Sequence, residues 1–297
     1  MAIKKQDKVF QDLQRILESQ DFKSEDDVRK FMDGLMGKPI PSFPKESLTI
    51  KEQAQDLIFE AVEQPEDKGY QLALKALRMD PDCIEAYEYL GALEPIPETA
   101  ILYYKNGIEI GKQIFAKTHF KTGIGNFWMI HETRPFMRCL QAYADCFKDM
   151  GRYHDAVSVY EEMISLNPND NQGVRDQLLL YLIKINEYNK YRKYDKLYKD
   201  DLGAFMSFNR ALFAFKTVGS SSNSNELLQQ AIKSNKYVIP KLISKSISDD
   251  FPEVYGMGDE NEAIYYCYFA HQIWHDTDGA IDWIKRKTKD SGLKIVK

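Results

Sequence analysis

The sequence has no long hydrophobic run. All of its apolar stretches fall short of the roughly 18 residues that a membrane-spanning helix needs. Residues 1–5 lead into an amphipathic segment and not into the apolar core of a secretion signal. We therefore expect a protein that neither crosses a membrane nor is secreted.

Cysteine is scarce as well. The four cysteines show no metal-ligand spacing. Cys139 and Cys146 would lie roughly 10 Å apart along a helix, which is too far for a disulfide. Free thiols are typical of the cytoplasm, and we expect the protein there.

Signatures of nucleotide binding and of catalytic nucleophiles are missing. Residues 123–125 and 256–258 match only G-x-G, without a third glycine or the Lys-Ser/Thr of a phosphate loop. The sequence contains no Gly-x-Ser-x-Gly. His271 and His275 stand four apart on an expected helix and could share a metal ion, but no third ligand is apparent, and packing is the alternative. We expect no cofactor, no metal and no catalytic residue.

A basic excess is also absent. The net charge is −5, and residues 50–112 hold 13 acidic and 6 basic side chains, which disfavours nucleic acid as a partner. The exception is a basic, tyrosine-rich stretch over residues 188–199. Tyr191, Tyr194 and Tyr198 recur there at helical spacing, so we expect the rings to pack inward and the lysines to be solvated. Phosphate binding by the lysines is the alternative.

No segment shows sustained period-two alternation, whereas helical periodicity is strong. Residues 140–168 form one helix–turn–helix unit of tetratricopeptide type. Its second helix carries Ala156, Tyr160 and Met163 on one face and ends at Pro168. One such unit cannot bury its apolar face alone, so we expect neighbours that stack on it.

The same template predicts further helix pairs along the chain. They cover residues 50–83, residues 87–107 with a shortened second helix, residues 178–197, residues 202–217 with 225–234, and residues 259–286. The serine-rich residues 219–224 are expected to be a flexible loop. The predicted fold is an all-α, right-handed, tetratricopeptide-like solenoid of about five to six helix pairs.

The ends of the chain differ from the repeats. Residues 1–37 predict an N-terminal helical hairpin, whose second helix begins at a Ser24–Asp27 cap. We assign residues 38–48 to a proline-containing linker, residues 49–290 to the solenoid with an insertion at 113–135, and residues 291–297 to a tail. Asp259 and Glu262 predict a capping box at the start of the last pair.

Three runs carry a specific resemblance. They read E-T-R-P-F-M-R over residues 132–138, N-P-N-D-N-Q-G-V-R over residues 167–175 and G-D-E-N-E-A-I over residues 258–264. Together they resemble bacterial tetratricopeptide proteins related to the suppressor of tumorigenicity 7 family. Phe136 stands where that family usually has tyrosine. The resemblance covers about residues 50–285 and implies an interaction scaffold without catalytic residues.

Helix capping explains part of these runs. Thr133 and Pro135 suit the start of one helix, and Asn169 or Asp170 suit the cap of the next. Other polar residues are left over, and by the resemblance the second, fifth and ninth positions of the first helices face a concave groove. The predicted partner-binding residues are Glu85, Glu88, Glu132, Arg134, Arg138, Gln141, Asp145, Gln172 and Arg175.

We expect a non-catalytic scaffold that binds a protein or peptide in this groove, and neither nucleic acid nor membrane. Arg138, Gln141 and Arg175 would hydrogen-bond acidic or backbone groups, while Glu85 and Glu88 would favour basic ones. The sequence does not indicate an oligomeric state.

Two alternatives stay open. The arginines of the runs could instead pair internally with Glu132 or Asp145. The chain could also be a hydrolase or metal-assisted enzyme that uses Glu132 with His131, or His271 with His275.

Overall fold

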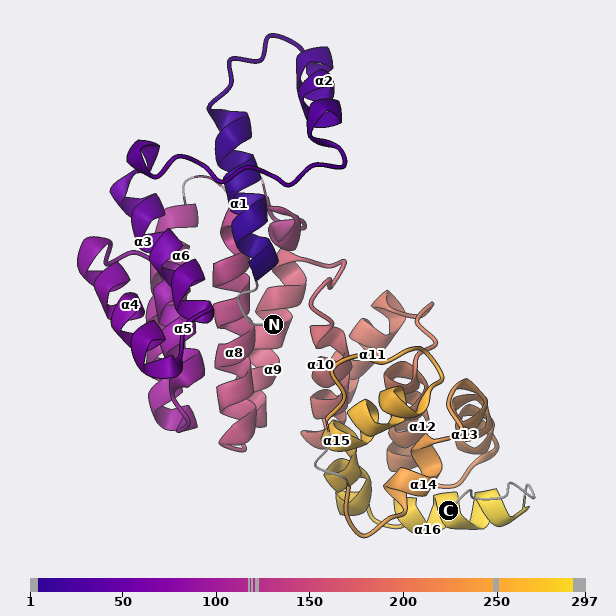
Figure 1. Ribbon diagram of the computed structural model, residues 1–297. Coiled ribbons are helices and arrows are strands. Elements are labelled where there is room, and N and C mark those ends of the chain that lie inside the picture. The colour runs from indigo at the N-terminus through magenta and orange to yellow at the C-terminus, as the bar shows by residue number, and fades with distance from the viewer. Residues whose placement is uncertain (1–4, 117, 119, 121–122, 248–250, 291–297) are drawn as a thin grey trace. The chain divides into compact units, whose positions relative to one another are not determined.

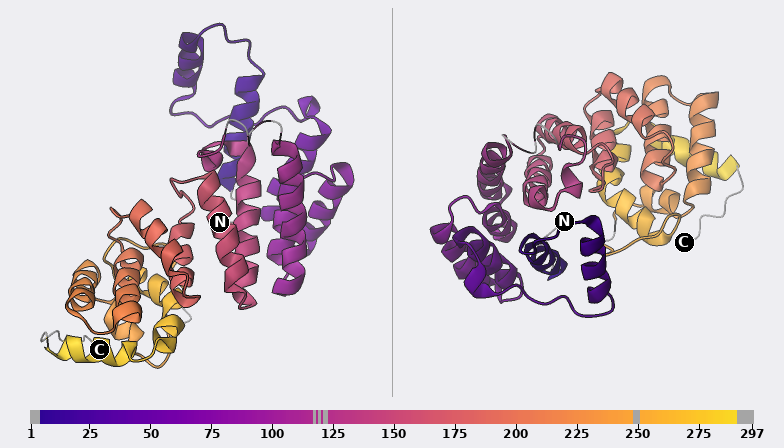
Figure 2. Two further views of the ribbon diagram at one scale, coloured as in Figure 1. Left: turned by 180° about the vertical axis from the view of Figure 1, so that it is seen from behind. Right: turned by 90° about the horizontal axis from the view of Figure 1, so that it is seen from above.

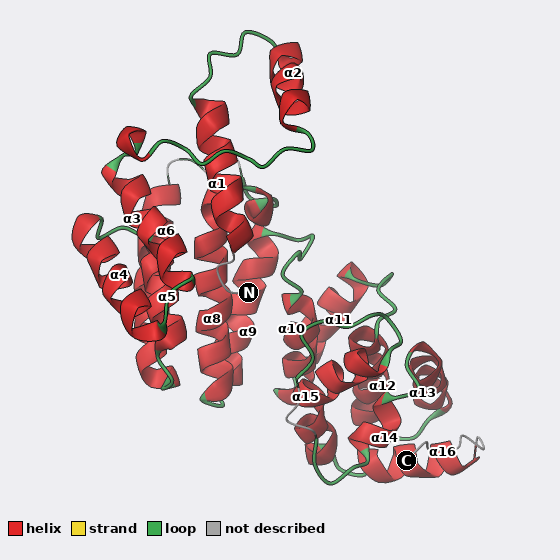
Figure 3. Ribbon diagram, in the orientation of Figure 1, coloured by secondary structure: helices red, strands yellow, loops and turns green. Residues whose placement is uncertain are grey.

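The structure is a computed structural model that describes residues 5–116, 118, 120, 123–247 and 251–290. Within these residues every regular element is a helix and none is a strand (Figure 3), which confirms the all-α prediction. No helix in the described part is both long enough and apolar enough to cross a membrane. The expected tail over residues 291–297 lies outside the described residues.

The chain divides into two compact units, one ending at Gln172 and the other beginning at Gly173. The boundary falls inside the range 49–290 that we expected to form one array. We describe each unit by itself.

Unit 1, up to Gln172, is built from antiparallel helix pairs (Figure 1). Consecutive helices contact each other within and between the pairs, as a helical repeat requires. The pairs are α3 (Ile50–Val62) with α4 (Glu66–Met79), α5 (Ile84–Leu93) with α6 (Pro97–Phe115), and α8 (Arg134–Asp149) with α9 (Tyr153–Leu166). The expectation of a shortened second helix was wrong for α6, which runs for 19 residues.

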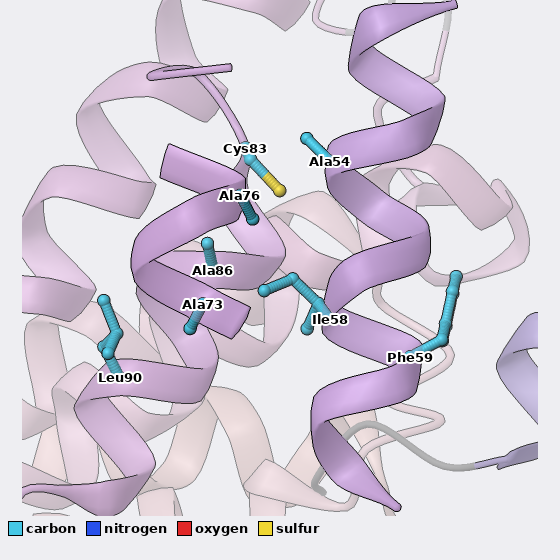
Figure 4. Close-up of a cluster of buried hydrophobic side chains, with 8 residues drawn as sticks. All are labelled: Ala54, Ile58, Phe59, Ala73, Ala76, Cys83, Ala86 and Leu90. Carbon is cyan, nitrogen blue, oxygen red and sulfur yellow. The ribbon is translucent and has the colours of Figure 1, made fainter. Parts of the chain in front are cut away.

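Small side chains allow the first pairs of unit 1 to approach closely. Ala54 and Ile58 of α3 face Ala73 of α4 and Ala86 of α5 in a cluster from which solvent is excluded (Figure 4). Phe59 points to the other side of α3. Among the first helices, α5 contacts both α3 and α8, and the three form an inner layer.

The N-terminal helix α1 (Lys5–Glu18) joins unit 1 by contacting α3. It buries a charged face, because Arg15 donates to Asp56 at 2.7 Å and Asp12 is buried beside it. Val9 and Phe10 stay 42% and 53% exposed. The view from above shows this darkest helix on the inner side of the helix pairs of unit 1 (Figure 2). The amphipathic pattern predicted the helix, but its apolar face is not the face that packs on α3.

The helix α2 (Glu25–Leu35) follows, and none of its residues is buried. Its predicted cap is confirmed, since the Ser24 side chain accepts from the backbone N–H of Asp27. The short 3-10 helix η1 (Lys45–Ser47) then leads to α3, whose Thr49 and Glu52 form a complete capping box.

Between α6 and α8 the described insertion contains the 3-10 helices η2 (Phe127–Met129) and η3 (His131–Thr133). Phe127 and Phe136 are fully buried and meet Phe115 in an edge-to-face cluster. Gly111 permits this packing, because a Cβ there would lie 2.5 Å from the Phe136 ring. The phenylalanine of the E-T-R-P-F-M-R run is therefore a core residue.

Unit 2, from Gly173, is also helical, and its helices pack around α10, α12 and α15. The rings of Phe215 and Trp283 stack at 4.4 Å in its core, and Tyr191 stacks on Phe213 at 4.0 Å. Its helices are α10 (Val174–Lys184), α11 (Tyr188–Leu197), α12 (Ala204–Val218), α13 (Ser222–Ser234), α14 (Val238–Leu242), α15 (Glu260–Asp276) and α16 (Ala280–Asp290).

The structure tests two predictions for unit 2, the serine-rich loop and the inward-facing tyrosines. The loop expected over residues 219–224 is shorter than predicted, because α13 already begins at Ser222. Ser221 and Ser224 form a capping box at this helix start. The inward tyrosines are confirmed for Tyr191 and Tyr194, which are buried. Tyr198 lies just beyond the end of α11.

Three predicted caps turned out differently. Thr133 stands at the N-cap of α8, but its hydroxyl donates to the carbonyls of Phe127 and Ile130 and so closes the insertion on itself. Neither Asn169 nor Asp170 caps α10, whose N-cap is Gly173 at a φ of 74°.

The third case is the start of α15. Asp259 caps the helix by accepting from the N–H of Glu262, as expected. The Glu262 carboxylate does not complete the box. It accepts instead from Gly258 N, Asn235 Nδ2 and Ala204 N, the last at the start of α12.

Candidate functional site

A cavity of about 320 Å³ opens between the helices of unit 1. Its walls come from the C-terminal end of α3, from α5, from the first turns of α6 and from α8. The lining residues are Val62, Glu88, Tyr89, Ala92, Leu93, Tyr104, Arg138, Gln141, Ala142 and Asp145. Four of the nine predicted partner-binding residues, Glu88, Arg138, Gln141 and Asp145, are therefore brought together in one place.

A buried ion pair forms one wall of the cavity. Arg138 Nε donates to Glu88 Oε1 at 2.7 Å, and the two residues are only 6% and 5% exposed. Burial raises the pKa of the Glu88 carboxyl to about 7, although the Arg138 guanidinium opposes the shift. The second carboxylate oxygen, Oε2, is buried and accepts no hydrogen bond from any described residue.

Asp145 supplies the other carboxylate of the cavity. Its Oδ1 accepts from the Tyr160 hydroxyl at 2.9 Å. Burial raises the pKa of the Asp145 carboxyl, and the charge of Lys148 and the Tyr160 hydroxyl counteract that rise. Lys148 lies one turn further along α8, with Nζ 3.1 Å from Asp149 Oδ1. When both carboxyls are ionised, Glu88, Arg138 and Asp145 give the lining one net negative charge.

Gln141 and Gln172 tie the loop after α9 to the site. Gln172 Nε2 donates to Gln141 Oε1 at 2.8 Å and to the carbonyl of Met137 at 3.3 Å. Gln172 does not itself line the cavity. Through its hydrogen bond to Gln141, Gln172 positions that side chain at the cavity.

Besides Gln172, three predicted residues of unit 1 lie outside the cavity lining. Glu85 Oε1 accepts from Gln55 Nε2 at 2.5 Å. Gln14 Nε2 on α1 lies 3.5 Å from Glu132 Oε1. Arg134 Nε donates to the backbone carbonyl of Trp128 at 3.1 Å. The Arg134 guanidinium lies over the Trp128 indole ring.

Arg175 belongs to unit 2, where it pairs with Asp201 through Nε and Nη2 at 2.9 and 2.8 Å. Its guanidinium also lies 5.4 Å from the Tyr198 ring centre. Internal pairing of the arginines is thus present: Arg138 pairs with Glu88, and Arg175 pairs with Asp201.

The residues of the enzyme alternative are placed as follows. His271 Nε2 lies 3.0 Å from the carbonyl of Ser244, and His275 Nε2 lies 2.9 Å from that of Leu242. A carbonyl oxygen only accepts, so each Nε2 carries the hydrogen and is not available to a metal ion. Among the described residues no group of three or more His, Cys, Asp or Glu is arranged to hold a metal. The four cysteines are free and buried.

A comparison with curated proteins gives a distant relative, and no family model matches the chain. The suppressor of tumorigenicity 7 protein-like of Gallus gallus is 24% identical over 235 residues, which cover 70% of this chain. This similarity supports a relation to that family. The chain spans 42% of the length of the relative.

The sequence did not identify the apolar half of the cavity. Tyr89, Leu93 and Tyr104 were not predicted as site residues, although all three fall in the helix pair expected over residues 87–107. Continuing the groove-facing spacing of α5 by one turn beyond Glu88 leads to Ala92, so helical periodicity could have found that wall.

Proposed function

We propose that the chain is a non-catalytic, cytoplasmic scaffold of the right-handed tetratricopeptide type, and that unit 1 binds an extended segment of a partner protein. The observation that carries this proposal is the cavity between α3, α5, α6 and α8. At about 320 Å³ it is near the lower end of the roughly 300–1,000 Å³ typical of ligand sites. It has room for one or two side chains and not for a folded element.

The lining suits a peptide. Apolar side chains such as Val62 and Leu93 can cover aliphatic carbons, while Gln141 and Asp145 offer acceptors that fix orientation. The inner helix α3 is already covered by α1 near Glu52 and Asp56. Val62 lies at its opposite end, so a bound segment would extend from the cavity without displacing these ion pairs.

The test is selection of peptides from a random displayed library on the whole chain, followed by affinity measurement by fluorescence anisotropy. Ala142→Trp places a large ring in the cavity. Leu102→Trp is the matched control, because Leu102 is an exposed residue of α6. We expect selected peptides to bind the native chain and Leu102→Trp equally and to lose at least about tenfold in affinity for Ala142→Trp. Equal binding to all three proteins would refute the proposed site.

A further inference from the structure

Two carboxylates, those of Glu88 and Asp145, line the cavity of unit 1. Glu88 Oε2 is buried without a described donor, and the Asp145 carboxylate and the Gln141 amide oxygen line the same space. The cationic residue in the lining, Arg138, is already engaged by Glu88 Oε1 at 2.7 Å. A buried carboxylate oxygen without a donor is costly, typically about 1–3 kcal/mol or more.

The rest of the lining indicates what kind of ligand would carry a hydrogen-bond donor into the cavity. Val62, Ala92, Leu93 and Ala142 are aliphatic, and the Tyr104 ring adds an aromatic surface. A lysine side chain combines an aliphatic stem with an ammonium group that carries three donors and no acceptor. This combination matches a cavity that is lined by both aliphatic side chains and carboxylates.

We propose that the cavity recognises an alkylammonium group, as on a lysine side chain of the bound segment. This inference rests on the proposed peptide-binding function and adds the chemistry of its central contact. The ammonium donates to the Asp145 carboxylate and pairs with the charge of the Glu88 carboxylate, while the stem lies against the aliphatic walls. It brings one positive charge to a lining that has one net negative charge when both carboxyls are ionised.

The experiment titrates the whole chain with two capped tripeptides, acetyl-Gly-Lys-Gly-amide and the same peptide with Nε-acetyllysine. Methyl NMR of Ala92 and Ala142 reports binding inside the cavity. We expect the lysine peptide to shift these methyl resonances with a saturable curve. The acetyllysine peptide keeps the stem but lacks the charge, so we expect it to bind at least about tenfold more weakly.

Asp145→Asn keeps the size of the side chain and its acceptor for Tyr160 while removing the charge. We expect it to weaken the lysine peptide by about tenfold or more. Glu109→Gln removes an exposed carboxylate from α6 and is the control, for which we expect no change.

The inference would be overturned by equal binding of both tripeptides, or by an Asp145→Asn affinity equal to that of Glu109→Gln. Absence of any methyl shift with the lysine peptide would overturn it too. The proposed function is judged separately, because selected peptides that are blocked by Ala142→Trp but contain no required lysine would support the scaffold and refute only the ammonium site.

Discussion

Replacing Arg138 by alanine should destabilise unit 1 far more than an ordinary surface substitution. The residue is 6% exposed, and its partner Glu88 is 5% exposed. Removing one member of a buried pair leaves the other charge uncompensated, which typically costs about 3–5 kcal/mol. If the free energy of unfolding falls by about 2 kcal/mol per molar urea, the urea concentration at the unfolding midpoint of unit 1 should decrease by about 1.5–2.5 M.

Two units can unfold separately, so the assay has to resolve them. Hydrogen exchange with mass spectrometry at increasing urea follows peptides from α8 and from α12 in one sample. Arg152→Ala is the matched control in the same unit, because its pair with Asp155 leaves side chains 54% and 46% exposed. Such a pair contributes about 0–1 kcal/mol.

A double substitution separates charge from packing. Glu88→Met with Arg138→Met removes both charges and keeps similar volumes, which is often neutral or stabilising for a buried pair. We expect the double variant to recover most of the loss seen in Arg138→Ala. The reasoning would be refuted if Arg138→Ala lost no more stability than Arg152→Ala, or if the double variant were as unstable as the single one.

Three further predictions concern the same unit. Because the pKa of Glu88 is raised from 4.5 to about 7, the stability it contributes is complete below about pH 4.5 and is lost as the pH rises through 7; carboxyl carbon NMR should show a midpoint near 7 and not near 4.5. Gly91→Ala should lower the melting temperature, since its Cβ would lie 2.7 Å from the Tyr104 ring, whereas Gly34→Ala in open space should not. Arg15→Ala should increase hydrogen exchange throughout α1, and unchanged protection there would show that its ion pairs do not hold the helix.

Much of the fold could be predicted because local signals determine helix pairs. In α9 the residues Ala156, Tyr160 and Met163 recur at helical spacing, and all three are buried. The boundaries follow from the same pattern, since α9 ends at Leu166, just before Pro168. These features depend on residues within a few turns of one another.

The partners of the charged residues could not be predicted in the same way. Glu132 and Asp145 lie close to Arg138 in sequence, yet its partner is Glu88, which is 50 residues upstream. The pairing arises because the first helices α5 and α8 contact each other across the inner layer. Nothing in the local sequence distinguishes one glutamate from another as the acceptor.

The buried face of α1 could not be predicted for a related reason. Of its apolar positions, Val9 and Phe10 are exposed and Leu13, Ile16 and Leu17 are half-buried. The buried residues among its described side chains are Asp12 and Arg15. The surface that α1 meets carries Glu52 and Asp56, and the Arg15 guanidinium lies within ion-pair distance of both, at 3.2 Å and 2.7 Å. An amphipathic pattern therefore predicts a helix more reliably than it predicts which face packs.

The three runs that carry the family resemblance serve mainly to build the scaffold. Thr133 closes the insertion on itself, Gln172 braces α8, and Glu262 joins the starts of α15 and α12. From these runs only Arg138 reaches the cavity, and there it is paired with a glutamate. The two carboxylates that line the cavity, those of Asp145 and Glu88, lie outside all three runs. A relative could therefore keep the runs and the fold while changing Asp145, and it would then be expected to bind a different class of partner.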